Sequence, residues 1–241
     1  MIRKIKILRC PSLTYNFSGI LPLGLATITA ELRHHGYTIA QDDLDAKCTS
    51  EGKVLPRHRW GKDFPAKTLI SDLPRVRNFW EGGNDQEVIS LVESVLAITD
   101  LDTFDTILLS CYQGDDYSAI LALCIGKYIR EHMGKFVIIG GEAFPHMEPI
   151  KNEVAYFVKN GCFDYYIQGY GEVPLLELFK RLDDGSSLDN VPGLVVPKGN
   201  NVIFNEPVFT RPEVIPDFEG LPYGPLLQIS GRMERRVFIT G

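Results

Sequence analysis

Short apolar runs alternate with amphipathic segments along the first 185 residues of the chain. Runs rich in β-branched residues predict buried strands at 5–8, 37–40, 106–109, 136–139 and 165–167. Between them, apolar residues recur at helical spacing, as in Leu25, Ile28 and Leu32, before a helix-ending Gly36. This alternation predicts a Rossmann-like or flavodoxin-like α/β fold, a doubly wound parallel sheet. By analogy with flavodoxin-like folds, we expect the strand order 2-1-3-4-5 or a close variant.

Residues 46–83 interrupt this alternation. They contain several prolines, the pair Gly82-Gly83 and little apolar periodicity. Eight Lys and Arg residues (47, 53, 57, 59, 62, 67, 75, 77) stand against four acids (51, 63, 72, 81), so the stretch is locally positive by four. It could cover anionic groups of a ligand or be a solvated excursion. We favour the excursion, because scattered charges usually face water.

The pattern changes again after residue 185. Two short apolar segments, 194–196 and 202–204, flank the turn-forming Lys198-Gly199-Asn200-Asn201 and predict a C-terminal β-hairpin. The proline-rich stretch 207–225 predicts an extended strap. We therefore divide the chain into a domain at 1–185 with an insert at 46–83, a hairpin and linker at 186–234, and a strand at 235–241 that starts a truncated second domain.

Composition narrows the function classes. A net charge of −6 over 241 residues argues against broad nucleic-acid binding, which needs a basic face. No apolar run approaches the ~20 residues that span a bilayer, and the N-terminus lacks a signal-peptide core, so we expect a cytoplasmic protein without membrane contact. Five scattered cysteines predict reduced thiols and no metal site. Cys10 and Cys111 end apolar strands and could line a pocket, but for these as for Cys124 and Cys162 we favour a packing role over chemistry.

Four predicted strand exits carry small or hydroxyl-bearing residues suited to a ligand. Because the carboxyl ends of parallel strands meet at one edge of a sheet, we expect these exits to form one binding edge. No nucleophile is paired with a base, and neither a dinucleotide nor a nucleotide-triphosphate fingerprint is present, which favours a flat or large ligand. The candidate residues are Ser12, Tyr15, Asn16, Ser110, Cys111, Tyr112, Gly140, Gly141, Glu142, Gly169, Tyr170, Gly171 and Glu172.

Several of these motifs, in this order, resemble the N-terminal cobalamin (B12)-binding domain of radical SAM enzymes. Leu21-Pro22-Leu23-Gly24-Leu25-Ala26 with Leu32-Arg33-His34-His35-Gly36-Tyr37 is similar to that family's opening helix. Val137-Ile138-Ile139-Gly140-Gly141 and Asp164 to Glu172 are similar to its "V-V-x-G-G" and "D-Y-V-x-x-G-E-G-E". Val191-Pro192-Gly193-Leu194, the hairpin and the strap match the next segments of that family, so the resemblance spans about residues 4 to 241.

The resemblance implies a Rossmann-like domain that binds cobalamin with its nucleotide tail along the strand ends. Ser110 then stands at the serine that contacts the tail, Gly140-Gly141 at the glycines that let it pass, and Gly169, Gly171 and Glu172 at the third ligand loop. The D-x-H-x-x-G of cobalamin domains that ligate cobalt through histidine is absent, which implies base-off cobalamin without a histidine ligand. Tyr15 or Asn16 could face the cobalt from below.

The resemblance also implies a larger enzyme. A radical SAM domain would come next, with a C-x-x-x-C-x-x-C motif that holds a [4Fe–4S] cluster and S-adenosylmethionine; this motif is absent from the chain, which should be inactive alone. The whole enzyme would methylate an unactivated carbon or phosphorus of a small-molecule or peptide substrate, or catalyse another radical rearrangement. Two alternatives stay open: an accessory domain that no longer binds cobalamin and serves as scaffold or substrate cap, and a flavodoxin-like regulatory module with a phospho-acceptor among Asp42, Asp43 and Asp45.

Overall fold

The computed structural model describes residues 3–13, 22–50, 65–111, 116–141, 153–199, 201–207, 209 and 213–221. Its strands are β1 (Lys4–Arg9), β2 (Thr38–Asp43), β3 (Thr106–Ser110), β4 (Phe136–Gly140), β5 (Tyr165–Ile167), β6 (Leu194–Lys198) and β7 (Asn201–Phe204). Its helices are α1 (Leu23–His34), α2 (Leu44–Ser50), α3 (Pro65–Ser71), α4 (Leu73–Trp80), α5 (Gln86–Leu96), α6 (Asp116–Met133), α7 (Val154–Lys159) and α8 (Glu172–Asp184).

All seven strands belong to one mixed sheet, in the order β2-β1-β3-β4-β5-β6-β7. The first five are parallel, which confirms the predicted 2-1-3-4-5 order and the α/β class. The hairpin is also confirmed, since Lys198 pairs with Asn201 across its turn. The prediction left the position of the hairpin open. In the structure β6 pairs with β5 in antiparallel orientation, so the hairpin extends the sheet.

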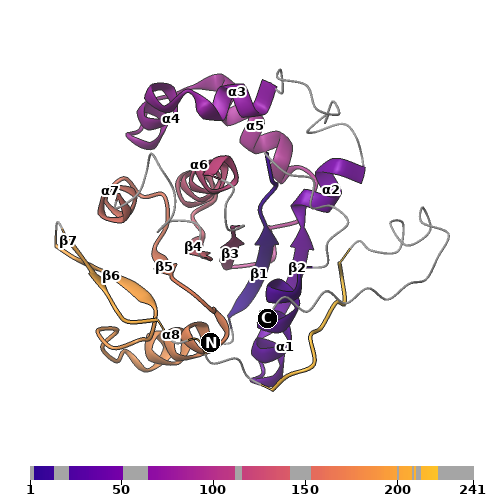
Figure 1. Cartoon of the computed structure of the whole chain (residues 1–241), viewed down its shortest axis with the longest axis vertical. Coiled ribbons are helices and arrows are strands. Elements are labelled where there is room, and N and C mark those ends of the chain that lie inside the picture. Colours follow the sequence, from indigo (N-terminus) through magenta and orange to yellow (C-terminus); the bar gives the residue numbers. More distant parts are fainter. Residues whose placement is uncertain are drawn as a thin grey trace.

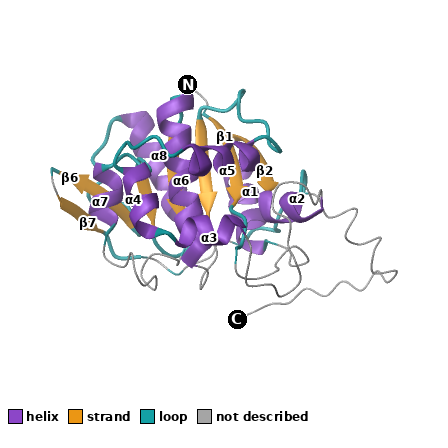
Figure 2. Cartoon of the chain, turned by 90° about the horizontal axis from the view of Figure 1, so that it is seen from above, coloured by secondary structure: helices purple, strands orange, loops and turns teal. Residues whose placement is uncertain are grey.

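Helices cover both faces of the sheet, as Figures 1 and 2 show. Side chains of successive strand residues point to opposite faces, and in β4 this sends Val137 and Ile139 into one core and Ile138 into the other. The larger core lies between the sheet and α2 to α7, whereas the smaller core is formed with α1 and α8. The nearly continuous apolar runs of the central strands result from this burial on both faces.

The insert departs from our prediction of a solvated excursion. The structure describes 46–50 and 65–83 of the insert, and in the second of these ranges helices α3 and α4 place Ile70, Val76 and Trp80 in the larger core, each with 0% exposure. Two of its cations, Arg75 and Arg77, form ion pairs with Asp85 and Glu153. That interpretation is therefore wrong for α3 and α4, because the insert covers the sheet; residues 51–64 lie outside the described part.

The strap crosses from the hairpin to the opposite edge of the sheet. Gly193 donates its N–H to the carbonyl oxygen of Glu206 (3.0 Å), the residue before the strap, and a Cβ on Gly193 would lie 3.6 Å from the Cα of Pro207, the first residue of the strap. The last described part of the strap lies against β2, where the Gln41 side-chain amide donates to the carbonyl oxygens of Asp217 (2.7 Å) and Glu219 (2.9 Å). The described residues of the strap form neither helix nor strand, as predicted. The predicted strand at 235–241 lies outside the described residues.

Candidate edge site

The carboxyl ends of four neighbouring strands lie in register. Arg9 of β1 pairs with Ser110 of β3, Ser110 with Gly140 of β4, and Gly140 with Ile167 of β5. The backbone ladder continues one residue further, since Cys111 N–H donates to the Gly140 carbonyl oxygen (3.1 Å) and Gly141 N–H to that of Ile167 (3.3 Å). The predicted strand exits therefore do share one edge of the sheet.

Gly140 and Gly141 have different structural roles. A Cβ on Gly141 would lie 2.6 Å from the carbonyl oxygen of Cys111, and its φ of +125° suits glycine alone. The Tyr166 hydroxyl, which donates to the Gly141 carbonyl oxygen (2.9 Å), fixes this turn further. Among the described residues, a Cβ on Gly140 would meet only the Ile167 carbonyl oxygen, at 3.8 Å. Packing within the described residues thus explains Gly141, whereas it leaves space open at Gly140.

Buried charged residues stabilise the carboxyl end of β1 and the start of the loop that follows it. The Arg9 guanidinium donates to the Asp43 carboxylate (2.9 Å), and the two side chains are 5% and 0% exposed. Asp45, two residues beyond the end of β2, accepts the N–H of the predicted site residue Ser12 (2.8 Å). Ser12 itself is 2% exposed. Acidic residues of the β2 exit therefore position the start of the loop after β1.

The structure corrects our prediction that β2 ends before the acidic run. We expected the strand to end at residue 40, but it continues through Asp42 and Asp43. Burial opposes ionisation of Asp42, yet hydrogen bonds from Lys47 and Lys6 outweigh it and lower the pKa of Asp42 below its ordinary value. Carboxylates that are buried and engaged in this way are poorly placed to accept phosphate, which disfavours the regulatory-module alternative.

The exit of β5 contributes an aromatic pair. Tyr170 and Phe209 meet edge to face, with ring centroids 5.7 Å apart. Gly169 packs against the same ring: it has a φ of +80°, and a Cβ there would come within 3.5 Å of Phe209. Phe209 is 62% exposed. Sequence analysis missed Phe209, because only the path of the strap brings it to this edge.

The helix after this exit begins with a buried acid. Glu172 is the first residue of α8 and is 4% exposed, a position where a carboxylate interacts favourably with the helix dipole. The preceding Gly171 faces α1, since a Cβ there would lie 3.0 Å from Ile28 Cδ1. Packing against α1 thus accounts for Gly171, and the start of α8 accounts for Glu172.

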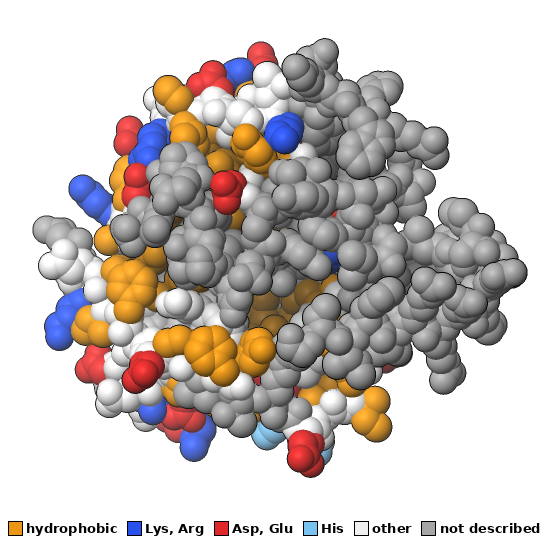
Figure 3. Space-filling view, viewed as in Figure 1, with side chains coloured by type: hydrophobic (Ala, Val, Ile, Leu, Met, Phe, Trp, Pro, Cys, Tyr) orange, Lys and Arg blue, Asp and Glu red, His pale blue; other side chains and the backbone are white. Residues whose placement is uncertain are grey.

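Not every predicted site residue can be placed. Tyr15, Asn16, Tyr112 and Glu142 lie outside the described residues. Within the described ranges, His, Cys, Asp and Glu side chains nowhere gather in threes as a metal site requires. In the same ranges no helix combines the length and apolar character needed to cross a membrane. Figure 3 shows charged side chains mainly along the outline of one face, with hydrophobic ones nearer its middle.

Comparisons with known proteins give matches at the level of structure alone. No protein-family model matches the sequence, and no curated protein matches it. The radical S-adenosylmethionine methyltransferase TsrM from Kitasatospora setae, with cobalamin and a [4Fe-4S] cluster bound, is 16% identical with a TM-score of 0.48, over 90% of this chain and 31% of that one. The cobalamin-dependent S-adenosylmethionine radical enzyme OxsB, with aqua-cobalamin and S-adenosylmethionine bound, is 17% identical with a TM-score of 0.49, over 87% of this chain and 23% of that one.

Apo OxsB is similar too, at 19% identity and a TM-score of 0.46 over 86% of this chain and 22% of that one. The chain therefore spans less than a third of the length of each of these proteins. The strand order of the chain itself establishes its α/β architecture.

Proposed function

We propose that this chain is the cobalamin-binding module of a B12-dependent radical SAM enzyme that methylates an unactivated centre. Three features support the proposal: the ordered sequence motifs, the 2-1-3-4-5 parallel sheet and the convergence of the motif-bearing exits on one edge. The solved structures with cobalamin bound, TsrM and OxsB, fit the same proposal but add no independent argument at their low similarity.

The observation that carries the proposal is the open space at Gly140. Of the described residues, a Cβ on Gly140 would have one neighbour within 4 Å, the Ile167 carbonyl oxygen. A bare backbone at the end of a central strand lets a large ligand approach the peptide groups closely. The residues present therefore fit a long, partly flat molecule such as the nucleotide tail of cobalamin.

Different residues of the edge would make different contacts with cobalamin. Ser110, half-buried beside Gly140, would offer a hydroxyl to the tail. Tyr170 and Phe209 would form an aromatic wall where β5 ends. Bound cobalamin would supply a cobalt centre that carries a methyl group. In the proposed whole enzyme, a further domain would supply the [4Fe–4S] cluster and S-adenosylmethionine.

Gly141 does not distinguish cobalamin binding from the alternative of a scaffold that no longer binds cobalamin. The Gly141 backbone and its contact with Cys111 need glycine even when no ligand is present. Retention of Gly141 is therefore expected in both cases, and a substitution there would damage the fold rather than report on binding. Gly140 is the position that separates the two hypotheses.

The test is equilibrium dialysis of the purified chain against hydroxocobalamin, with visible spectra of the protein compartment recorded afterwards. We expect wild type to retain corrin absorbance and Gly140→Val to lose it while keeping the wild-type melting temperature. Gly24→Ala is the matched control, because Gly24 is exposed on α1 and a Cβ there meets no atom of the described residues within 4 Å. If the compartment with wild-type protein retains no corrin absorbance, the proposal is wrong and the scaffold alternative is favoured.

A further inference from the structure

Two cysteines occupy matching positions on neighbouring strands. Arg9 and Ser110 form the last register pair between β1 and β3, and Cys10 N–H donates to the Ser110 carbonyl oxygen (3.0 Å). Cys10 and Cys111, the next residue on each strand, therefore lie side by side. Paired strands lie about 4.8 Å apart, and a disulfide needs Cα atoms separated by roughly 4.4–6.8 Å. The backbone spacing suits a bond between these residues.

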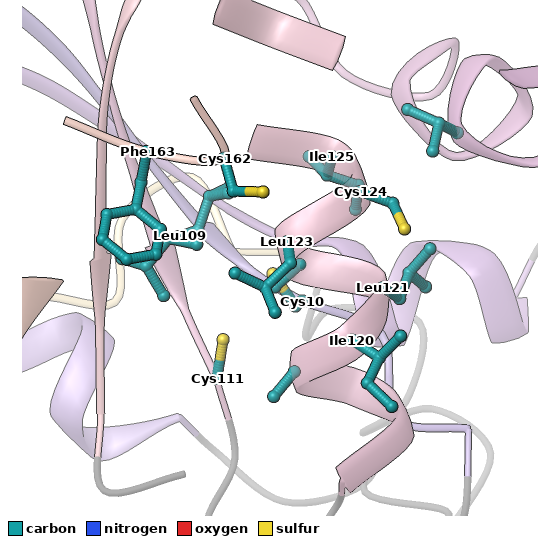
Figure 4. Packing of buried hydrophobic residues seen from close by; sticks show 14 of the residues in the cluster. Cys10, Leu109, Cys111, Ile120, Leu121, Leu123, Cys124, Ile125, Cys162 and Phe163 are labelled. Carbon is teal, nitrogen blue, oxygen red and sulfur yellow. The ribbon is translucent and has the colours of Figure 1, made fainter. Parts of the chain in front are cut away.

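The two side chains also point to the same face of the sheet. Cys10 is two residues beyond Leu8, and Cys111 two beyond Leu109, so each shares its neighbour's face. All four belong to the larger core, part of which Figure 4 shows between the sheet and α6, with both cysteines labelled. The nearby Cys111 thiol raises the pKa of Cys10, and burial raises it further, which fits two thiols in close proximity.

Their position at the edge sets them apart from the other cysteines. Cys10 is 2% exposed and Cys111 is 7% exposed, whereas Cys48, Cys124 and Cys162 are each 0% exposed. Cys124 and Cys162 are also close enough to influence each other, since Cys124 contributes to the raised pKa of Cys162. A small oxidant can reach the first pair when the strand ends open locally, but it reaches the second only when the core opens.

We propose that Cys10 and Cys111 form a redox-active dithiol that a peroxide converts to a disulfide. The Cys111 thiolate attacks one peroxide oxygen, the O–O bond breaks, and water leaves after the second oxygen takes up a proton. Cys111 is then a sulfenic acid. The Cys10 sulfur attacks the Cys111 sulfur, the S–O bond breaks, and hydroxide leaves as water with the Cys10 proton. Two thiols are oxidised and one peroxide is reduced to two waters.

The modification would act on the candidate edge directly. A disulfide between these residues joins the last rungs of the ladder between β1 and β3, at the start of the loops that leave both strands. The inference rests on the positions of the two thiols alone, so it holds whether or not the edge binds a corrin.

The test treats the reduced protein with increasing hydrogen peroxide, blocks remaining thiols with an alkylating agent and maps linked peptides by mass spectrometry. Trypsin releases 10–33 with Cys10 and 78–127 with both Cys111 and Cys124, and cleavage before Asp115 by Asp-N separates the last two. We expect the first disulfide to link Cys10 to Cys111 and to disappear on reduction.

Serine variants provide the controls. Cys111→Ser should abolish the linked peptide, whereas Cys124→Ser should retain it. Cys10→Ser gives a second route if Cys111→Ser folds poorly, as judged by circular dichroism. Oxidation of Met133 serves as an internal marker that enough peroxide was present. Absence of the Cys10–Cys111 link at that dose, or its appearance only after a Cys124–Cys162 link, would overturn the proposal.

Discussion

Arg77 of α4 and Glu153, the residue before α7, form an ion pair of 2.7 Å across two segments that are 76 positions apart in sequence. Around it, the Tyr156 hydroxyl donates to Glu81 (2.9 Å), and Trp80 packs edge to face on Phe157 with ring centroids 5.0 Å apart. These contacts fasten the insert to the parallel sheet domain. The insert is therefore a structural part of that domain.

Substitution of Trp80 tests this conclusion. Trp80 is fully buried, so Trp80→Ala should lower the free energy of unfolding by about 3–5 kcal/mol through lost packing and a cavity. Phe204→Ala is the control, because Phe204 is 54% exposed and its loss should cost less than about 0.5 kcal/mol. Urea unfolding monitored by circular dichroism measures both. Equal small effects would restore the interpretation of a solvated excursion.

A second prediction concerns Gly141. The strain of a non-glycine residue at φ +125° should cost about 1–3 kcal/mol, and the contact of the new Cβ with the Cys111 carbonyl oxygen should add to it. Gly141→Ala should therefore melt well below wild type, whereas Gly140→Ala should melt close to it. Differential scanning fluorimetry compares the two variants. Similar melting temperatures would contradict the distinction between the two glycines.

The strap should depend on Gln41. Its side-chain amide donates to Asp217 and Glu219, and its oxygen accepts from Thr29 (3.0 Å). Gln41→Leu removes these partners and should destabilise the fold by about 1–3 kcal/mol. It should also speed chymotryptic cleavage after Phe218. Gln86→Leu, on the exposed start of α5, should leave the cleavage rate unchanged.

Acid should reveal the role of Asp42. Its pKa is lowered in the folded protein, so its contribution to stability is present above the ordinary value near 3.8 and is lost as the pH falls through the lowered pKa. Asp42→Asn should be less stable than wild type at neutral pH, and the gap should narrow below about pH 4. Urea unfolding at several pH values, from neutral to below about pH 4, measures the difference in unfolding free energy between the two proteins. A gap independent of pH would show that ionisation of Asp42 does not support the fold.

The aromatic wall gives a prediction that depends on the proposed function. If Phe209 packs on a bound corrin, Phe209→Ala should weaken hydroxocobalamin binding by roughly tenfold, about 1.4 kcal/mol, without changing the melting temperature. Phe204→Ala again serves as the control, because Phe204 is also an exposed aromatic residue but lies on the hairpin. Equilibrium dialysis against hydroxocobalamin measures the affinities. Equal affinity of both variants would remove Phe209 from the site.

The parallel sheet could be predicted from the sequence because its strands and helices each leave a local pattern in the chain. Val137, Ile138 and Ile139 form a β-branched run that is buried on both faces, and the helices between strands carry regular apolar spacing. The insert escaped prediction because its buried residues are divided between two short helices, α3 and α4, with Pro74 near the start of the second. Neither helix is long enough to show a repeating pattern.

The end of β2 was predicted too early for a different reason. Charges such as Asp42 and Asp43 stand inside a strand only when cations compensate them, and these come from Lys6 and Arg9 on the neighbouring strand. That compensation depends on the pairing of β1 with β2 rather than on adjacent sequence. The shared edge itself was predictable, because parallel topology fixes it, but the exposed aromatic residue Phe209 reaches it only through the path of a segment without regular structure.

The strap has a consequence for association between molecules. An open sheet ends in strands whose free backbone groups can pair with another chain. At the β2 end, Arg33 donates to the Ile39 carbonyl oxygen (3.1 Å), and Asp217 and Glu219 lie against Gln41. The protein thus covers this border of its sheet with the Arg33 side chain and with the strap, which the Gln41 side chain holds in place. The border at β7 carries the exposed Phe204 instead, and any edge-to-edge contact through the described strands would form there.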